Sequence, residues 1–123
     1  MAKKRKSAQA EKLTKAIIRG MQEKKATEIV LMDLREARNA VADFFVICSG
    51  TSDKQLSAIA DSVTEETSKE LGEEPWHLEG RQNKEWMLLD YINVVVLIFK
   101  KDKRSFYALE KLWGEDRKST RLN

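Results

Sequence analysis

The sequence predicts an α/β fold: a single domain with a mixed β-sheet of about five strands flanked by helices. Apolar residues recur at helical spacing in two segments, 11–24 and 52–71, whereas short runs rich in β-branched residues lie between and after them. The later strands are joined by a connection as short as Ile92-Asn93, and such a hairpin requires antiparallel neighbours. The length of 123 residues fits one domain.

The first part of the chain predicts a tail, a helix and two strands. Residues 1–10 are rich in Lys and Ala, and we expect a disordered basic tail there. A helix follows up to Lys24, and strands at 28–34 and 44–48 flank the polar connection 35–42. The apolar stripe of the helix consists of Leu13, Ala16, Ile17, Gly20 and Met21.

The second helix has start and stop signals. Ser52 and Gln55 have the spacing of a capping box, in which each side chain bonds an otherwise unpaired backbone N–H. Gly72 suits the left-handed residue that ends many helices. The inward stripe between these signals consists of Leu56, Ile59, Ala60, Val63 and Thr67.

Three strands are expected after this helix. Pro75 and Gly80 bracket a short one, with Trp76 and Leu78 on one side. A polar hairpin loop follows at 81–84. The last two strands are predicted at 86–91 and 94–99.

A final helix is predicted at 104–113, where Phe106, Leu109, Leu112 and Trp113 share one face and Gly114 ends it. The folded domain is therefore expected to span residues 11–115. Residues 116–123 are expected to be a second disordered tail.

Charge is divided unevenly along the chain. Residues 1–15 carry +5 and residues 117–123 carry +3, which leaves −5 on residues 16–116. Nucleic-acid-binding domains more often present a basic face. An acidic body suits a basic protein partner, because complementary potentials speed encounter, and it serves equally well as a solubilising surface.

Targeting and disulfide signals are absent from the sequence. No segment approaches the roughly 20 apolar residues of a membrane span, and no secretory signal is evident. The single Cys48 excludes an internal disulfide and a cysteine-based zinc site. We expect a cytoplasmic protein, with the matrix of an organelle as the alternative.

The sequence offers few residues for catalysis. His77 is the only histidine, and Cys48 ends an apolar strand, where cysteine behaves as a small hydrophobe. The small-residue turn at 49–52 can present backbone N–H groups to phosphate, but it lacks the Lys-Ser/Thr ending of a P-loop. Nucleotidyltransferases use a similar turn with paired carboxylates that hold metal ions. Here Asp90 stands alone, with Leu88 two positions before it.

Several blocks of the sequence resemble the ribosome silencing factor family, also called Iojap-like proteins. The blocks are VADFFVICSGTS at 41–52, EG at 79–80, WMLLDY at 86–91, VVV at 94–96 and RSFYALEKLW at 104–113. They occur in the expected order over nearly the whole chain. One departure is Leu97, where the family usually carries histidine. An apolar residue there is expected to strengthen the core.

The resemblance implies a nucleotidyltransferase-like fold without the catalytic metal site, no enzymatic activity, no cofactor and no metal. It implies a translational repressor that binds ribosomal protein fourteen of the large ribosomal subunit and sterically blocks joining of the small subunit when nutrients are short. The partner-binding candidates are Glu79, Trp86, Leu88, Leu89 and Asp90. Because side chains alternate along a strand, some of these must belong to the core.

Alternatives stay open at this point. The first is a nucleotide-binding enzyme built on the related fold, which would need a metal-binding carboxylate pair near Gly50. The second is a dimeric adaptor, since exposed apolar strand residues near Trp86 would serve a homodimer as well as a ribosome. The basic run at 3–6 is either a solvated tail or a minor contact to ribosomal RNA.

Overall fold

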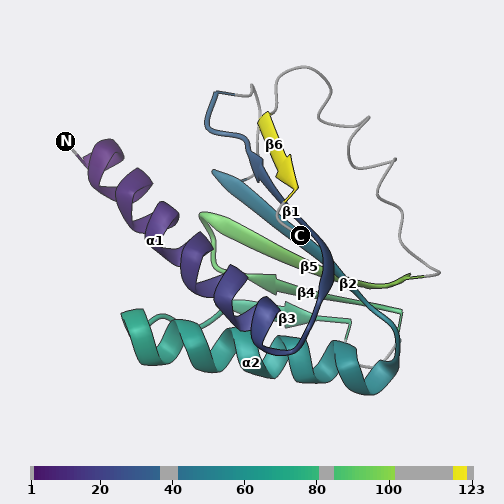
Figure 1. Ribbon diagram of the computed structural model, residues 1–123. Helices are drawn as coiled ribbons and strands as arrows, with labels where there is room; N and C mark the ends of the chain where they lie inside the picture. Colours follow the sequence, from purple (N-terminus) through teal and green to yellow (C-terminus); the bar gives the residue numbers. More distant parts are fainter. Residues whose placement is uncertain (1, 37–41, 81–84, 102–117, 122–123) are drawn as a thin grey trace.

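The computed structural model describes residues 2–36, 42–80, 85–101 and 118–121. Its elements form one α/β domain with a six-stranded sheet in the order β3-β4-β5-β2-β1-β6 (Figure 1). The helices are α1 (Ala2–Glu23) and α2 (Asp53–Leu71). The strands are β1 (Thr27–Asp33), β2 (Phe44–Gly50), β3 (His77–Glu79), β4 (Trp86–Asp90), β5 (Val94–Lys100) and β6 (Lys118–Arg121).

The sheet is mixed, as the sequence predicts. β2 and β5 are parallel, with Phe44 opposite Val94, and the chain passes through α2 and the β3–β4 hairpin between them. All other neighbouring strands are antiparallel. Both strands of the parallel pair are buried along most of their length, which is typical of central strands covered on two faces.

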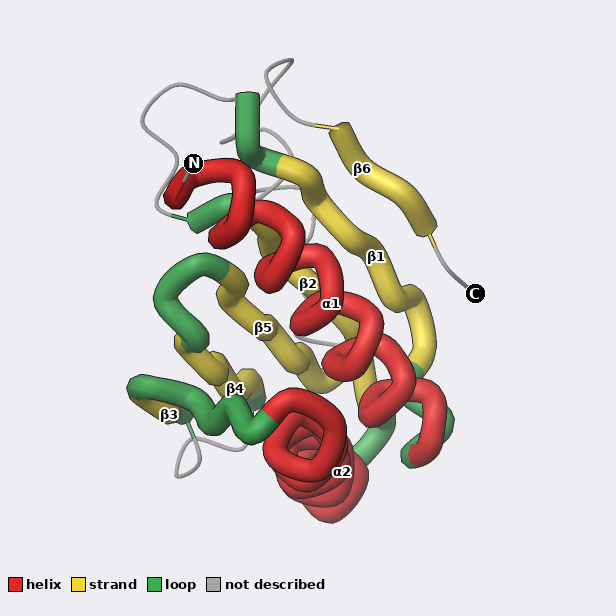
Figure 2. Tube along the Cα trace, turned by 90° about the vertical axis from the view of Figure 1, so that its left-hand side faces the viewer, coloured by secondary structure: helices red, strands yellow, loops and turns green. Residues whose placement is uncertain are grey.

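Both helices cover the same face of the sheet (Figure 2). The main core lies between them and the sheet, and it includes Leu13, Ile17, Met21, Ile59, Val63, Val96 and Ile98. The helices approach closely at Gly20, where an added Cβ would lie 2.7 Å from the Cα of Val63. Glycine permits this crossing, and the Ser62 hydroxyl donates a hydrogen bond to the Gly20 carbonyl at 2.8 Å.

A second cluster of buried apolar side chains lies on the other face of the sheet. It consists of Val30, Met32, Leu34, Ala42, Phe45, Ile47, Val95 and Leu97, with Leu88 and Phe99 packed against it. Leu97, at the position where the family usually carries histidine, is buried in this cluster. An apolar side chain therefore suits the position, because a buried imidazole would need hydrogen-bond partners.

The signals at the ends of α2 are confirmed, with one difference. The Ser52 hydroxyl accepts a hydrogen bond from the Gln55 N–H at 3.1 Å, and Gly72 ends the helix at φ +65°. The Gln55 side chain does not return to the Ser52 N–H as in a simple capping box. Its Oε1 accepts from the Thr51 N–H at 2.7 Å instead, which leaves its Nε2 to reach the carbonyls of Lys24 and Lys25.

Both chain ends differ from the expected tails. α1 begins at Ala2 rather than near residue 11, because Ala, Lys, Arg, Gln and Glu are strong helix formers and Ala10 already packs into the core. Residues 118–121, expected to be disordered, form β6 and pair with β1, with Val30 opposite Arg121. The hairpin loop at 81–84 and the helix predicted at 104–113 lie outside the described residues.

Candidate partner-binding surface

The partner-binding candidates lie on β3 and β4, at one edge of the sheet. Along β4 the burial alternates, so Trp86, Leu88 and Asp90 share the face turned away from the helices. The side chain of Leu89 points the other way and is completely buried in the main core. The prediction that Leu89 contacts a partner is therefore wrong for its side chain, since a strand cannot present consecutive residues on one face.

Glu79 joins the same face from β3. It lies directly opposite Leu88 across the antiparallel pair, and His77 lies opposite Asp90. The Glu79 carboxylate is exposed and lies 3.2 Å from the Nε2 atom of His77, an ion pair when the imidazole is protonated. The structure thus brings together four of the five predicted residues: Glu79, Trp86, Leu88 and Asp90.

Gly80 determines where the Trp86 ring lies. Its φ of +90° is in the region that favours glycine, and an added Cβ would lie 2.3 Å from the Trp86 carbonyl oxygen and 2.8 Å from Cε3 of the ring. The indole therefore packs directly on the Gly80 backbone. On its other side it has Phe99 as its cross-strand neighbour on β5. Trp86 is half-buried, so the ring is fixed in place while part of it still faces solvent.

Asp90 organises the end of β4. Its Oδ1 atom accepts a hydrogen bond from the Ile92 N–H at 2.7 Å, and its carbonyl accepts one from the Trp76 N–H at 2.7 Å. The hairpin is closed by the Tyr91 N–H, which donates to the Val94 carbonyl at 2.8 Å. Asp90 therefore contributes negative charge to the surface and also holds two neighbouring backbone segments in position.

The turn before α2 is occupied by the protein's own groups. The Thr51 N–H donates to Gln55, and the Gln55 N–H donates to the Ser52 hydroxyl. Asp53 adds a carboxylate in the first turn of the helix, where it complements the positive end of the dipole. A phosphate would meet this carboxylate and would find two of the backbone donors already engaged, so the turn is best explained as a structural junction.

The other residues considered for chemistry lie apart from one another. Cys48 is buried in the main core, whereas His77 is exposed on the edge strand. Within residues 2–36, 42–80, 85–101 and 118–121, no group of three His, Cys, Asp or Glu side chains is arranged to hold a metal ion. In that same part of the chain, neither helix is long and apolar enough to cross a bilayer.

A small cavity of about 130 Å³ lies where α1, the end of α2 and the β4–β5 turn meet. Its lining includes Leu13, Leu71, Glu73 and Tyr91. The Tyr91 hydroxyl forms a buried hydrogen bond with Thr67 Oγ1 at 2.9 Å. Burial raises the pKa of Tyr91, hydrogen bonding with Thr67 and Thr64 lowers it, and the charges of Glu73 and Glu74 raise it. Tyr91 is thus a neutral structural residue at physiological pH.

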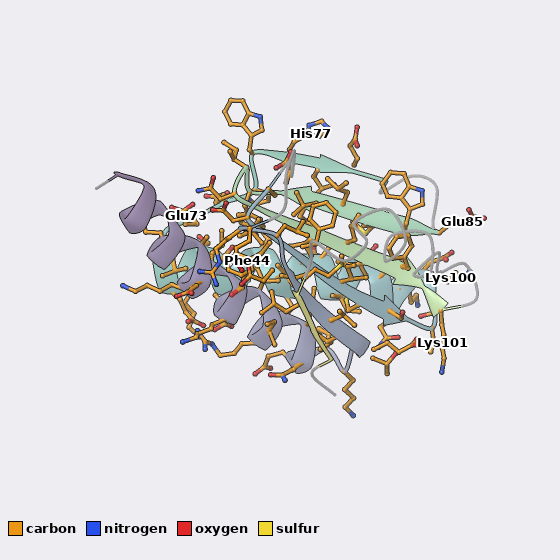
Figure 3. The ribbon with its side chains drawn as sticks, turned by 90° about the horizontal axis from the view of Figure 1, so that it is seen from above. Phe44, Glu73, His77, Glu85, Lys100 and Lys101 are labelled. Carbon is orange, nitrogen blue, oxygen red and sulfur yellow. The ribbon has the colours of Figure 1, made fainter. Side chains whose placement is uncertain are left out.

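Three features of this edge of the sheet do not follow from the sequence. The sequence predicts Gly80 only as the end of a strand, yet the Trp86 ring packs on its backbone. Trp76 was expected on one side of a strand with Leu78, but it precedes β3 and is 76% exposed. The sequence predicts a tight turn at Ile92, but its apolar character does not indicate that the side chain is 59% exposed. Figure 3 shows His77 and Glu85, the sequence neighbours of Trp76 and Trp86, well separated along this edge.

The family model described as "Ribosomal silencing factor during starvation" matches residues 7–123. The chain belongs to the ribosomal silencing factor family. A Bacillus subtilis relative named ribosomal silencing factor RsfS is 44% identical over 93 residues, covering 76% of this chain and 77% of the relative. The relative of that name from Halalkalibacterium halodurans is 39% identical over 105 residues, covering 85% of this chain and 88% of its own length.

A solved structure supports the fold. The crystal structure of a Bacillus halodurans protein aligns with a TM-score of 0.75 at 36% identity, covering 91% of this chain and 99% of that one. The resemblance inferred from the motifs is therefore confirmed, and so is the single α/β domain of a silencing factor. The match from residue 7 to residue 123 includes most of α1 and all of β6, two segments that lie at least partly in the expected tails.

Proposed function

We propose that this protein is a cytoplasmic translational repressor that binds the large ribosomal subunit and sterically blocks joining of the small subunit. In this proposal it docks on ribosomal protein fourteen of the large subunit and damps translation when nutrients are limiting. Membership of the silencing factor family and the names of the relatives support the silencing role. The docking partner follows from the family resemblance.

The observation that carries the docking surface is the arrangement of Trp86, Leu88, Asp90 and Glu79 on one face of an edge hairpin. A half-buried tryptophan is a favoured anchor, because it buries a large area while losing little conformational freedom. The two carboxylates beside it suit a basic protein, since opposite potentials speed encounter and disfavour wrong partners. Basic residues in the first turns of α1 would add a minor contact to ribosomal RNA.

Catalysis plays no part in this proposal. The turn before α2, where a nucleotidyltransferase would bind phosphate, is closed by Gln55 and Ser52. Self-association is compatible with the same surface: two copies paired through the Trp86 face would hide it, so a homodimer would compete with ribosome binding.

The test is sedimentation of purified ribosomal subunits with the protein. Wild type is expected to travel with the large subunit and to reduce the fraction of assembled ribosomes. Trp86→Ala is expected to weaken binding about 10–100-fold, which is the size of effect seen for a buried aromatic anchor. Trp86→Phe, the matched control, keeps a ring on Gly80 and is expected to retain most of the affinity.

Two outcomes would contradict the proposal. If wild type stays at the top of the gradient at micromolar concentration, ribosome binding is refuted. If Trp86→Ala is folded by circular dichroism and binds as tightly as wild type, the docking surface is elsewhere.

A further inference from the structure

Trp76 and Ile92 form an exposed apolar corner beside the docking surface. Trp76 is 76% exposed and Ile92 is 59% exposed, whereas the other large hydrophobic side chains among the described residues are buried or half-buried. Water contact on this scale is unfavourable for both side chains. Two such residues whose backbone N–H groups both bond Asp90 are more informative than one, since scattered single exposures are ordinary.

The two residues are held together by Asp90. The Trp76 N–H donates to the Asp90 carbonyl, and the Ile92 N–H donates to the Asp90 carboxylate, each at 2.7 Å. The backbone positions of the corner are therefore fixed by hydrogen bonds on the sheet. The two side chains are therefore exposed from a hydrogen-bonded local structure.

Ile92 is also strained. Its φ is +75°, in a region where β-branched residues are rare because Cβ crowds the backbone. Asn or Gly would fit this turn position better. An apolar, β-branched residue that is both strained and exposed contributes little to the fold in this position. Such combinations occur where a side chain serves binding.

Carboxylates surround the corner. Glu73 and Glu74 immediately precede Pro75 and Trp76, and both are exposed. Glu73 lines the same cavity as Tyr91 and Asn93, the two neighbours of Ile92, and the charges of Glu73 and Glu74 both raise the pKa of Tyr91. Glu79 lies three residues after Trp76, on β3, where it pairs with His77. The corner therefore combines an exposed indole with negative charge.

We propose that the corner formed by Trp76 and Ile92 is a second anchor for a basic protein segment of the ribosomal partner. An Arg or Lys side chain stacks its cation on the Trp76 indole, and its aliphatic stem packs on Ile92. Glu73, Glu74 and Glu79 neutralise the charge of the segment. Nucleic acid is disfavoured, because these carboxylates repel phosphate. The inference rests on the proposed function and extends its surface.

The spacing allows one partner to use both anchors. Trp86 and Asp90 are four residues apart on β4, which corresponds to about 13 Å along an extended strand. A partner segment of only a few residues spans this distance. The corner thus enlarges the docking surface to both ends of the hairpin formed by β3 and β4.

The experiment measures the affinity of the full-length protein for purified large subunits. Trp76→Ala is expected to weaken binding about tenfold, whereas Trp76→Phe, the matched control, keeps an aromatic face and loses less. Glu73→Gln combined with Glu74→Gln is expected to weaken binding and to flatten its salt dependence. Neither change alters the core, so the melting temperature stays within about a degree of wild type.

Ile92→Asn separates binding from folding. Asn tolerates φ +75° better than Ile, so this variant is expected to melt at a higher temperature than wild type while binding more weakly. If Ile92 had a purely structural role, the stabilised variant would bind as well as wild type. That result, together with unchanged binding by Trp76→Ala, would overturn the inference and leave the proposed function standing.

Two further outcomes are decisive. If wild type itself does not bind large subunits, the proposed function fails and the second anchor fails with it. If Trp76→Ala weakens binding to protein-free ribosomal RNA as much as binding to whole subunits, the corner contacts nucleic acid and the assignment of a protein segment is refuted.

Discussion

Gly80→Ala is predicted to disturb both stability and binding, because Gly80 supports the Trp86 ring. An alanine Cβ would lie 2.3 Å from the Trp86 carbonyl oxygen and 2.8 Å from the ring atom Cε3, so the strand or the indole must shift. Overpacking of this kind costs about 1–3 kcal/mol. A positive φ costs an L residue about 1–2 kcal/mol more. The expected loss of unfolding free energy for Gly80→Ala is therefore about 2–5 kcal/mol.

Gly72→Ala is the matched control. Gly72 also has a positive φ of +65°, but an added Cβ there meets nothing within 4 Å. Only the cost of the positive φ applies, so the expected loss of unfolding free energy is about 1–2 kcal/mol. Urea unfolding, followed by circular dichroism and by tryptophan fluorescence, measures both variants. The fluorescence of native Gly80→Ala should differ from that of wild type because the Trp86 environment changes.

The comparison between the two glycine variants has two possible outcomes. Equal losses for Gly80→Ala and Gly72→Ala would show that no steric contact with Trp86 exists and would refute the reasoning. A larger loss for Gly80→Ala, accompanied by weaker binding to large subunits, supports the view that this glycine positions the anchor.

Two other predictions concern the scaffold. Gln55→Ala is expected to lower the unfolding free energy by about 1–2 kcal/mol, because the side chain bonds Thr51, Lys24 and Lys25 and water replaces these half-exposed bonds only in part. An unchanged unfolding free energy in urea would show that these bonds between the two turns are not stabilising. Tyr91→Phe is expected to cost about 1 kcal/mol at pH 7 by removing the bond to Thr67. Because the folded-state pKa of Tyr91 is raised above its unfolded value of about 10, its contribution is present below pH 10 and is lost as pH rises through the folded pKa. The unfolding free energy of Tyr91→Phe should therefore fall less than that of wild type when the pH is raised from 9 to 11. Parallel pH profiles for the two proteins would contradict this account.

Local signals in the sequence predicted most elements of the fold. The start of α2 depends on Ser52 and Gln55 and its end on Gly72, all within one segment, so these boundaries could be inferred. The parallel pairing of β2 with β5 joins residues fifty positions apart, such as Phe44 and Val94. No local pattern encodes this register. β6 was missed for the same reason, since its short polar sequence forms a strand only through pairing with β1.

The candidate site was predicted less completely than the fold. The motif identified Trp86 and Asp90, and strand alternation warned that some neighbours would be buried. Alternation does not tell which residues of the strand face inward, so the prediction includes Leu89 as a partner contact although its side chain lies in the main core. Gly80 and Ile92 depend on positive φ angles and on contacts with other strands. Such features follow from tertiary structure, and apolar character alone did not reveal that Ile92 is exposed.

The most direct test of the central claim is site-specific crosslinking from the β3–β4 surface to the ribosome. A photoreactive phenylalanine derivative replaces Glu79, which is exposed on the proposed docking face, or Glu65, which is exposed on α2 on the other side of the sheet. We predict that the residue-79 probe crosslinks to ribosomal protein fourteen when large subunits are added and that the residue-65 probe does not. Crosslinking from residue 65 alone, or from neither position while the protein remains bound, would contradict the docking surface proposed for this silencing factor.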